Sequence, residues 1–226
     1  MKILVVAAHP DDEILGCGGT LLRHRDRLDE IVIVIAAAGG TDRSNDQKGA
    51  DHYKDQLELK GREIATKLKA KTIHFFGLID NRLDGIERLE ITKRIEKINS
   101  QVKPDIVYTH HGSDLNVDHR RVFECVLTAC RPLPGRKTPD IYCFETVSST
   151  EWQDRNSARV FSPTYYVDIE TKIDEKLEIL KVYDCEMKEW PHPRSYEGVL
   201  VKSKLRGCEI GVNNAEAFEV IRQVWN

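Results

Sequence analysis

An apolar run passes directly into a histidine and three carboxylates in the segment Ile3-Leu4-Val5-Val6-Ala7-Ala8-His9-Pro10-Asp11-Asp12-Glu13. Residues 3–8 show no alternation of polar and apolar side chains, which is typical of a strand covered on both faces in a parallel sheet. In an open parallel sheet, ligand-binding and catalytic groups collect beyond the carboxyl ends of the strands. The segment therefore predicts a buried first strand with a functional site at its end.

Similar apolar runs alternate with helical patterns along most of the chain. The predicted strands are residues 3–8, 31–38, 72–77, 105–109 and 140–147, and the predicted helices are residues 13–25, 50–70, 87–102 and 118–130. The third helix is the clearest, because Ile91, Ile95 and Ile98 recur at helical spacing between charged residues. Successive βα units with right-handed crossovers build a doubly wound, mostly parallel sheet with helices on both faces. The sequence thus predicts an α/β fold.

The length of 226 residues, at roughly 150 residues per domain, favours a single domain for an α/β protein. We expect residues 1–147 to form the core and residues 148–226 to shape the substrate pocket. In this last part the pattern predicts a strand at residues 165–169, a helix after residue 173, an ordered loop at residues 190–195 and a final helix at residues 215–225.

Composition excludes several classes of protein. The chain has 34 Lys and Arg against 37 Asp and Glu, so no basic excess favours binding to nucleic acid or to an anionic membrane. Its longest apolar stretch, residues 31–38, is far shorter than the ~20 residues of a membrane span. The first residues lack the form of a secretory signal, so we expect a cytoplasmic protein. Without a C-x-x-C pair, we interpret the six cysteines as reduced structural thiols.

The spacing of His9 and Asp12 indicates a metal site. The two residues lie three positions apart with a rigid proline between them, so both side chains can converge on one cation and leave Asp11 beside it. An imidazole and a carboxylate together suit Zn²⁺. Alternatively, Asp11 and Asp12 could cap a helix that begins with Pro10. Capping needs only one carboxylate, however, and does not account for His9.

A second polar cluster follows the fourth predicted strand, in Thr109-His110-His111-Gly112-Ser113-Asp114-Leu115-Asn116-Val117-Asp118-His119-Arg120. The first and fourth strands of the predicted sheet end on the same edge, so His119 can supply a third metal ligand. Two histidines and one carboxylate leave a position open for water, as in catalytic zinc sites. Asp114 and Asp118 are suited to orienting an imidazole, and His110 to orientation or packing.

These motifs resemble a known family. His9-Pro10-Asp11-Asp12-Glu13, followed by Gly16-Cys17-Gly18-Gly19-Thr20, is similar to the signature of the PIG-L/LmbE-like zinc-dependent N-deacetylases, also called the GlcNAc-PI de-N-acetylase family. Asp114-x-Asn116-x-Asp118-His119-Arg120 resembles the second motif of that family. The resemblance implies a Rossmann-like fold, one Zn²⁺ or other divalent ion per chain, and hydrolysis of the N-acetyl group of an N-acetylglucosamine-type glycoconjugate. It also implies a homo-oligomer, a trimer or a hexamer.

The resemblance also implies a role for Asp11 as the general base, and its place beside the metal ligands agrees with that role. Zinc lowers the pKa of a bound water toward about 7 and polarises an acetyl carbonyl. The oxyanion that forms in this reaction would be stabilised by the metal and by a neighbouring hydrogen-bond donor.

One position departs from the family pattern, because Asn116 stands where many relatives carry a histidine. An amide can donate a hydrogen bond to an oxyanion or a sugar hydroxyl, but it cannot protonate the departing amine. We predict that His192, held between Pro191 and Pro193, supplies that proton, with Asp11 as the alternative. Arg194 suits a phosphate or carboxylate on the substrate. Residues expected to recognise sugar hydroxyls at the same edge are Asp80, Asn81, Arg82 and Asp84.

Three other functions fit parts of the sequence. A nucleotide-binding module would account for Gly16, Gly18 and Gly19, but the carboxylates in the preceding turn would repel a pyrophosphate. A metal hydrolase acting on a phosphoester or on a non-sugar amide stays open. A catalytically silent metal site is disfavoured, because such a site has no use for the uncoordinated carboxylate of Asp11.

Overall fold

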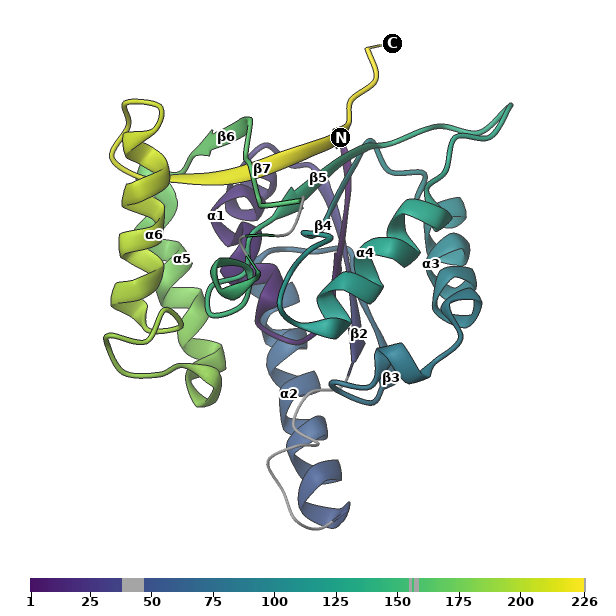
Figure 1. The fold of residues 1–226 in the computed structure, drawn as a ribbon, viewed down its shortest axis with the longest axis horizontal. Coiled ribbons are helices and arrows are strands. Elements are labelled where there is room, and N and C mark those ends of the chain that lie inside the picture. The colour runs from purple at the N-terminus through teal and green to yellow at the C-terminus, as the bar shows by residue number, and fades with distance from the viewer. Residues whose placement is uncertain (38–46, 155, 157–158, 226) are drawn as a thin grey trace.

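The computed structural model describes residues 1–37, 47–154, 156 and 159–225, and it forms an α/β fold (Figure 1). The strands are β1 (Lys2–Ala7), β2 (Glu30–Ala37), β3 (Thr72–Leu78), β4 (Ile106–His110), β5 (Asp140–Phe144), β6 (Tyr165–Asp168) and β7 (Ala215–Arg222). The helices are α1 (Asp12–Asp26), α2 (Gln47–Lys67), α3 (Arg88–Val102), α4 (Val117–Ala129), α5 (Ile173–Leu180) and α6 (Tyr196–Cys208).

All seven strands join one sheet in the order β3-β2-β1-β4-β5-β7-β6. Strands β1 to β5 are parallel, whereas β7 runs antiparallel to both β5 and β6. The chain leaves β1 toward β2 on one side and later returns to β4 on the other. The carboxyl ends of β1 and β4 therefore lie side by side at the point where the strand order reverses, which is where open α/β sheets bind ligands. This topology confirms the predicted doubly wound sheet.

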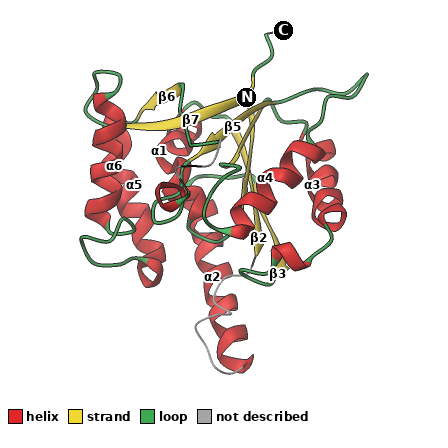
Figure 2. Cartoon of the chain, in the orientation of Figure 1, coloured by secondary structure: helices red, strands yellow, loops and turns green. Residues whose placement is uncertain are grey.

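Helices cover both faces of the sheet, as Figure 2 shows. Ile3 and Val5 of β1 belong to one apolar core with residues of α1, α2 and α5, and Leu4 and Val6 belong to the other with residues of α3 and α4. Neighbouring residues of one strand point to opposite faces, so a strand buried on both faces must be apolar at every position. This explains the uninterrupted apolar runs of the sequence.

The C-terminal part differs from the sequence prediction in two places. The helix expected at residues 215–225 is wrong, because this segment forms β7, the yellow arrow in Figure 1, inserted between β5 and β6. Phe218 pairs with both Phe144 and Tyr165, so β7 satisfies the backbone groups of two strands that would otherwise be unpaired. Helix α6 was not predicted either; it begins where Ser195 accepts a hydrogen bond from the Gly198 amide at 2.9 Å.

The boundaries of most other elements agree within a few residues. The fifth strand is shorter than expected and ends at Phe144, so residues 145–147 belong to the loop that follows. Residue 38, the predicted end of the second strand, lies outside the described residues. All six cysteines are free; four are buried, whereas Cys185 and Cys208 are exposed. Across the described ranges, no helix is both long and apolar enough to cross a membrane.

Helix α1 lies directly against the sheet because glycines line its inner side. A Cβ added at Gly16 would lie 2.2 Å from the ring of Phe144, and one added at Gly19 would lie 2.8 Å from Ile169. Such distances are shorter than side chains tolerate. The glycines of the first motif therefore allow the close approach that brings the beginning of α1 to the strand ends.

A buried ion pair supports α1 where its helical geometry breaks at Cys17 (φ −145°, ψ 21°). The carboxylate of Glu216 accepts hydrogen bonds from the backbone N–H groups of Gly19 and Thr20 at 2.8 and 2.7 Å. The ammonium of Lys176 donates to the same carboxylate at 2.7 Å. Glu216 and Lys176 are only 5% and 3% exposed. The carboxylate thus caps the second half of α1 from β7.

We expect the Glu216→Ala variant to lose about 3–5 kcal/mol of unfolding free energy, because it leaves a buried ammonium unpaired and removes the cap. Urea denaturation measures this loss. Glu90→Ala is the control, since Glu90 forms an exposed pair with Arg94 at 2.6 Å. This substitution should lower the unfolding free energy by less than about 1 kcal/mol. Equal losses in the two variants would contradict the role of the buried pair.

Candidate active site

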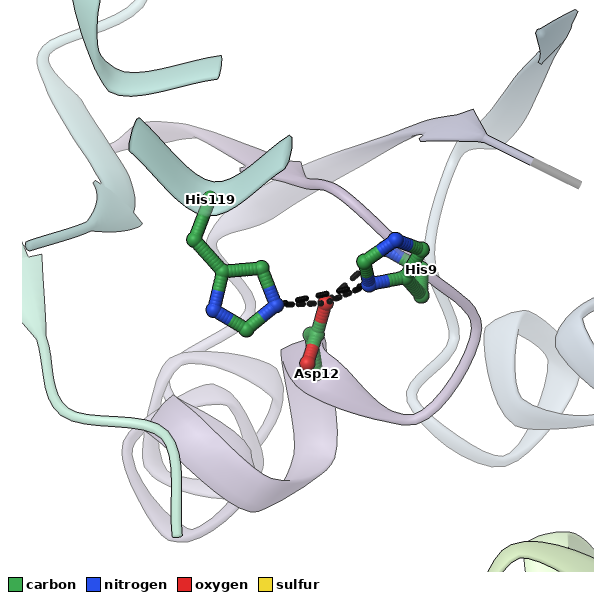
Figure 3. Close-up of side chains that lie close together, drawn as sticks. All are labelled: His9, Asp12 and His119. Atoms are coloured by element: carbon green, nitrogen blue, oxygen red, sulfur yellow. Dashed lines mark hydrogen bonds and ion pairs between the residues drawn. The ribbon is translucent and has the colours of Figure 1, made fainter. Parts of the chain in front are cut away.

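The side chains of His9, Asp12 and His119 meet at the carboxyl edge of β1 and β4 (Figure 3). His9 Nδ1 lies 3.2 Å from Asp12 Oδ2, and His119 Nε2 lies 3.3 Å from each of these two atoms. A tetrahedral zinc ion with ligands at about 2.0–2.1 Å requires ligand atoms about 3.3 Å apart. The three atoms therefore have the mutual spacing of zinc ligands.

Local structure brings each of the three side chains to this point. The backbone N–H of His9 donates to Asp12 Oδ2 at 2.8 Å, which folds the carboxylate back toward the imidazole. Asn116 is the N-cap of α4, with its side chain accepting from the amide of Asp118 at 2.8 Å. This cap starts the helix so that His119 lies in its first turn. The other oxygen of Asp12, Oδ1, is buried and has no hydrogen-bond partner in the described part of the chain.

Carboxylates lie close to the outer nitrogens of both imidazoles. Nε2 of His9 lies 2.8 Å from Asp80 and 3.0 Å from Asp118, and Nδ1 of His119 lies 3.0 Å from Asp114. His9, Asp80 and Asp118 also form a second group of ligand-type atoms. When Nδ1 of His9 faces a metal, however, Nε2 carries the proton and donates it to these carboxylates. Such contacts fix the tautomer and the ring orientation of a metal-binding histidine.

The electrostatics of the cluster favour a cation. Burial lowers the pKa of His119, but Asp12 and Asp114 outweigh it and raise the pKa to about 9. Burial alone would raise the pKa of Asp12, yet His119 and His110 hold it well below its usual range. Without a metal ion, His119 therefore carries an extra proton next to Asp12. A metal ion that binds to His119 would have to displace this proton.

His110 supports the cluster without belonging to it. Its Nε2 accepts a hydrogen bond from the Ala8 amide at 2.8 Å, and its ring stacks on that of His119 with centroids 3.9 Å apart. Burial lowers the pKa of His110 to about 4, so the ring is neutral at physiological pH. The position of His110 agrees with the prediction that its ring orients His119 by packing against it.

Asp11 lies beside the three ligand-type atoms but outside their cluster. Its backbone has φ 108°, and its side chain makes no capping hydrogen bond to the first turn of α1, so the alternative that it caps this helix is wrong. Asp11 Oδ2 instead accepts from Arg194 Nη1 at 3.1 Å. Burial raises the pKa of Asp11 to about 7, although Arg194 opposes this shift. A buried carboxyl with this pKa suits general base catalysis.

The loop before α6 brings Arg194 to Asp11 but leaves His192 further out. Arg194 Nε also donates to Ser148 Oγ at 3.1 Å. The Nδ1 atom of His192 accepts from the Arg194 amide at 3.1 Å, and its ring lies edge-on to Trp152 with centroids 5.6 Å apart. Among the described residues, no hydrogen bond or ion pair joins His192 to Asp11.

The other residues that were predicted to belong to the site lie at different positions relative to the cluster. Asp80 and Asp114 contact the imidazoles of His9 and His119, as described above. Nδ2 of Asn116 lies 3.4 Å from Asn81 Oδ1. Asp118 accepts from the backbone of the turn after β3, at 2.7 Å from the Asn81 amide. Arg82 is exposed and has no contact with the cluster in the described ranges.

Several side chains that hold the site together were not predicted from the sequence. Asp114 accepts hydrogen bonds from Ser149 Oγ and from Thr150 Oγ1, the latter at 2.5 Å. Tyr183 donates to Glu13 at 2.8 Å. Ser149 and Thr150 follow the fifth strand, and polar residues at a strand end were a usable signal for them. Tyr183 lies in a helical stretch and carries no such signal.

Sequence comparisons give relatives over most of the chain. The family model described as PIG-L: GlcNAc-PI de-N-acetylase matches residues 4–130. The "Uncharacterized deacetylase YaiS" of Escherichia coli K12 is 31% identical over 151 residues, which are 62% of this chain and 75% of that protein. The "Probable N-acetyl-alpha-D-glucosaminyl L-malate deacetylase 2" of Bacillus anthracis is 24% identical over 185 residues, covering 80% of this chain and 79% of the relative.

The fold matches that of a solved deacetylase. N,N'-diacetylchitobiose deacetylase from Pyrococcus horikoshii superposes with a TM-score of 0.79 at 21% sequence identity, covering 97% of this chain and 83% of that one. At this identity the likeness shows the fold alone. The family model, in contrast, covers more than half of the chain, including His9, Asp12 and His119. This chain therefore belongs to the PIG-L (GlcNAc-PI de-N-acetylase) family.

Proposed function

We propose that the protein is a metal-dependent hydrolase that removes the N-acetyl group from an N-acetylated amino sugar and releases acetate and a free amine. The observation that carries this proposal is the 3.2–3.3 Å spacing of His9 Nδ1, Asp12 Oδ2 and His119 Nε2, with the Asp11 carboxyl beside them. Family membership and the deacetylase names of the relatives support the reaction.

One Zn²⁺ per chain fits the ligand set, because two imidazoles and one carboxylate are typical zinc ligands. His9, Asp12 and His119 would hold the ion, which supplies a Lewis acid for the acetyl carbonyl and lowers the pKa of a bound water. The convergence of Asp12 Oδ2 with one nitrogen of each imidazole supports a cation at this place.

Asp11 acts as the general base in this proposal. Because Arg194 holds Oδ2, the other oxygen of the carboxyl is the one that takes the proton from the attacking water. Attack on the acetyl carbon then gives an oxyanion, and the C–N bond breaks once the amine nitrogen gains a proton. Asn116 cannot give that proton, but its Nδ2 can donate a hydrogen bond to the oxyanion or to a sugar hydroxyl.

His192 is our proposed source of the amine proton, with Asp11 as the alternative. Since Nδ1 of His192 accepts from the Arg194 amide, Nε2 is the ring nitrogen left to face the amine. For sugar recognition we propose the exposed Arg82 and the partly buried Asp80 and Arg194, together with Asp114, which is buried. The last three also contact His9, His119 and Asp11, so they would couple substrate binding to the orientation of the catalytic groups.

We expect the His192→Ala variant to lose about 10²-fold in kcat, the usual contribution of a general acid, while its metal content is unchanged. Steady-state acetate release and elemental analysis of the same preparation measure the two quantities. His52→Ala, at an exposed histidine of α2, is the control. A parent-like kcat in His192→Ala would move the role of acid to Asp11.

The function itself is tested by acetate release from a panel of acetylated sugars. The panel contains N-acetylglucosamine, its malate conjugate, its nucleotide- and lipid-linked forms and short chitooligomers. We expect acetate from at least one of them, loss of this activity on chelation, and recovery on adding Zn²⁺. Hydrolysis of p-nitrophenyl phosphate in the same samples, without acetate from any sugar, would instead favour a phosphoesterase.

A further inference from the structure

The backbone of Asp11 adopts a conformation that side-chain-bearing residues rarely adopt. Its φ of 108° and ψ of −33° lie outside the regions of ordinary helices and strands. Such a conformation persists only when surrounding groups hold it. Because the backbone sets the direction of the Cα–Cβ bond, the groups that hold this backbone also set where the side chain of Asp11 starts.

A chain of two buried hydrogen bonds holds the backbone of Asp11. The Asp11 amide donates to Glu13 Oε2 at 3.1 Å, and Glu13 Oε1 accepts from the hydroxyl of Tyr183 at 2.8 Å. Glu13 and Tyr183 are fully buried, so water does not replace either contact. Burial also raises the pKa of Tyr183 well above its usual value, which keeps the hydroxyl proton available for donation.

Tyr183 belongs to the 3₁₀ turn Lys181–Glu186 after α5, and it lies 170 residues from Glu13 in the sequence. Arg194 binds the carboxyl of Asp11 itself. Segments that follow residue 180 therefore hold both ends of this residue, the backbone through Tyr183 and the carboxyl through Arg194.

We propose that Tyr183 is a positioning residue for the hydrolytic reaction, acting through Glu13 on the backbone of Asp11. Its hydroxyl fixes the Glu13 carboxyl, which in turn fixes the Asp11 amide and so directs the base toward the metal ligands. This inference rests on the proposed function, in which Asp11 is the base. The contact with Arg194 persists without Tyr183, so losing the hydroxyl weakens catalysis but does not abolish it.

The Tyr183→Phe variant tests the proposal, because it removes only the hydroxyl. We expect kcat to fall about tenfold or more, since misplacing a reacting group by 1 Å can cost about 10²-fold, with KM and metal content unchanged. The matched control is Tyr108→Phe. Tyr108 is equally buried and its hydroxyl lies 3.0 Å from His24 Nε2, but it has no link to Asp11.

The control should lower Tm to a similar extent while kcat stays within twofold of the parent. A parent-like kcat in Tyr183→Phe, or an equal fall in both variants, overturns the proposal. In a Glu13→Ala background, adding Tyr183→Phe should change kcat by less than twofold, because the link is already broken. A full additional loss would show that Tyr183 acts by another route.

A second readout does not depend on activity. Hydrogen exchange of the Asp11 amide, followed by NMR in metal-free and zinc-loaded protein, should be at least tenfold faster in Tyr183→Phe and unchanged in Tyr108→Phe. Unchanged exchange in Tyr183→Phe contradicts the chain of contacts. If the parent releases no acetate and yet the exchange responds as expected, the proposed function fails while the positioning of Asp11 by Tyr183 stands.

Discussion

The Asp11→Asn variant should release acetate about 10³-fold more slowly than the parent while it still binds one metal ion per chain. General base catalysis contributes about 10²–10⁴-fold, and an amide of the same shape cannot take up the proton. Metal binding should persist because the three ligand-type atoms come from His9, Asp12 and His119. The amide oxygen can still accept from Arg194, so the loop before α6 keeps its contact.

Acetate release and zinc per chain, measured on one preparation, give the two results. Asp174→Asn, at an exposed aspartate of α5, is the control for removing one carboxylate and should match the parent in both. If Asp11→Asn retained kcat within tenfold of the parent on every substrate of the panel, Asp11 would not be the base. If it lost the metal as well, Asp11 would belong to the ligand set.

The His119→Ala variant should lose both the metal and the activity. It removes one of three ligands and leaves His9 and Asp12, which are too few to hold zinc in a tetrahedral site. Added Zn²⁺ raises the Tm of a protein that binds it in the folded state, so the parent should show such a rise. In His119→Ala this rise should be absent, and acetate release should fall to background.

His24→Gln is the matched control for this variant. His24 is also a buried histidine, but it pairs with Asp29 at 2.7 Å near the end of α1. We expect His24→Gln to lower the Tm of the metal-free protein and to keep the full rise on adding Zn²⁺. A normal rise in His119→Ala would exclude His119 as a ligand, whatever its effect on acetate release.

Most of the sheet could be predicted from the sequence, because the pattern that marks a buried strand lies in neighbouring residues. A strand buried on both faces is apolar at each position, and five such runs in alternation with helices specify the doubly wound topology. The final segment was predicted wrongly because its local pattern alone does not distinguish a helix from a strand. Residues 215–222 have apolar side chains at spacings that suit both a helix and a strand, and the unpaired edges of β5 and β6 select the strand.

The side chains that the sequence singled out as metal ligands lie close together in the structure, and each follows the end of a strand. His9 and Asp12 follow β1, and His119 begins the helix after β4, so topology alone brings them to one edge of the sheet. Asp114 and Asp118 were expected to orient imidazoles, and in the structure Asp114 contacts His119 and Asp118 contacts His9.

The amino-acid sequence by itself thus determined the core of the α/β fold and brought the proposed metal ligands His9, Asp12 and His119 to one edge of the sheet, because periodicity and strand ends depend on neighbouring residues. Only the tertiary structure decided how Asp11 is held. Arg194 and Tyr183 reach it from a part of the chain more than 160 residues away, through contacts that arise from packing. No local pattern encodes such contacts, since they depend on where the C-terminal segment docks.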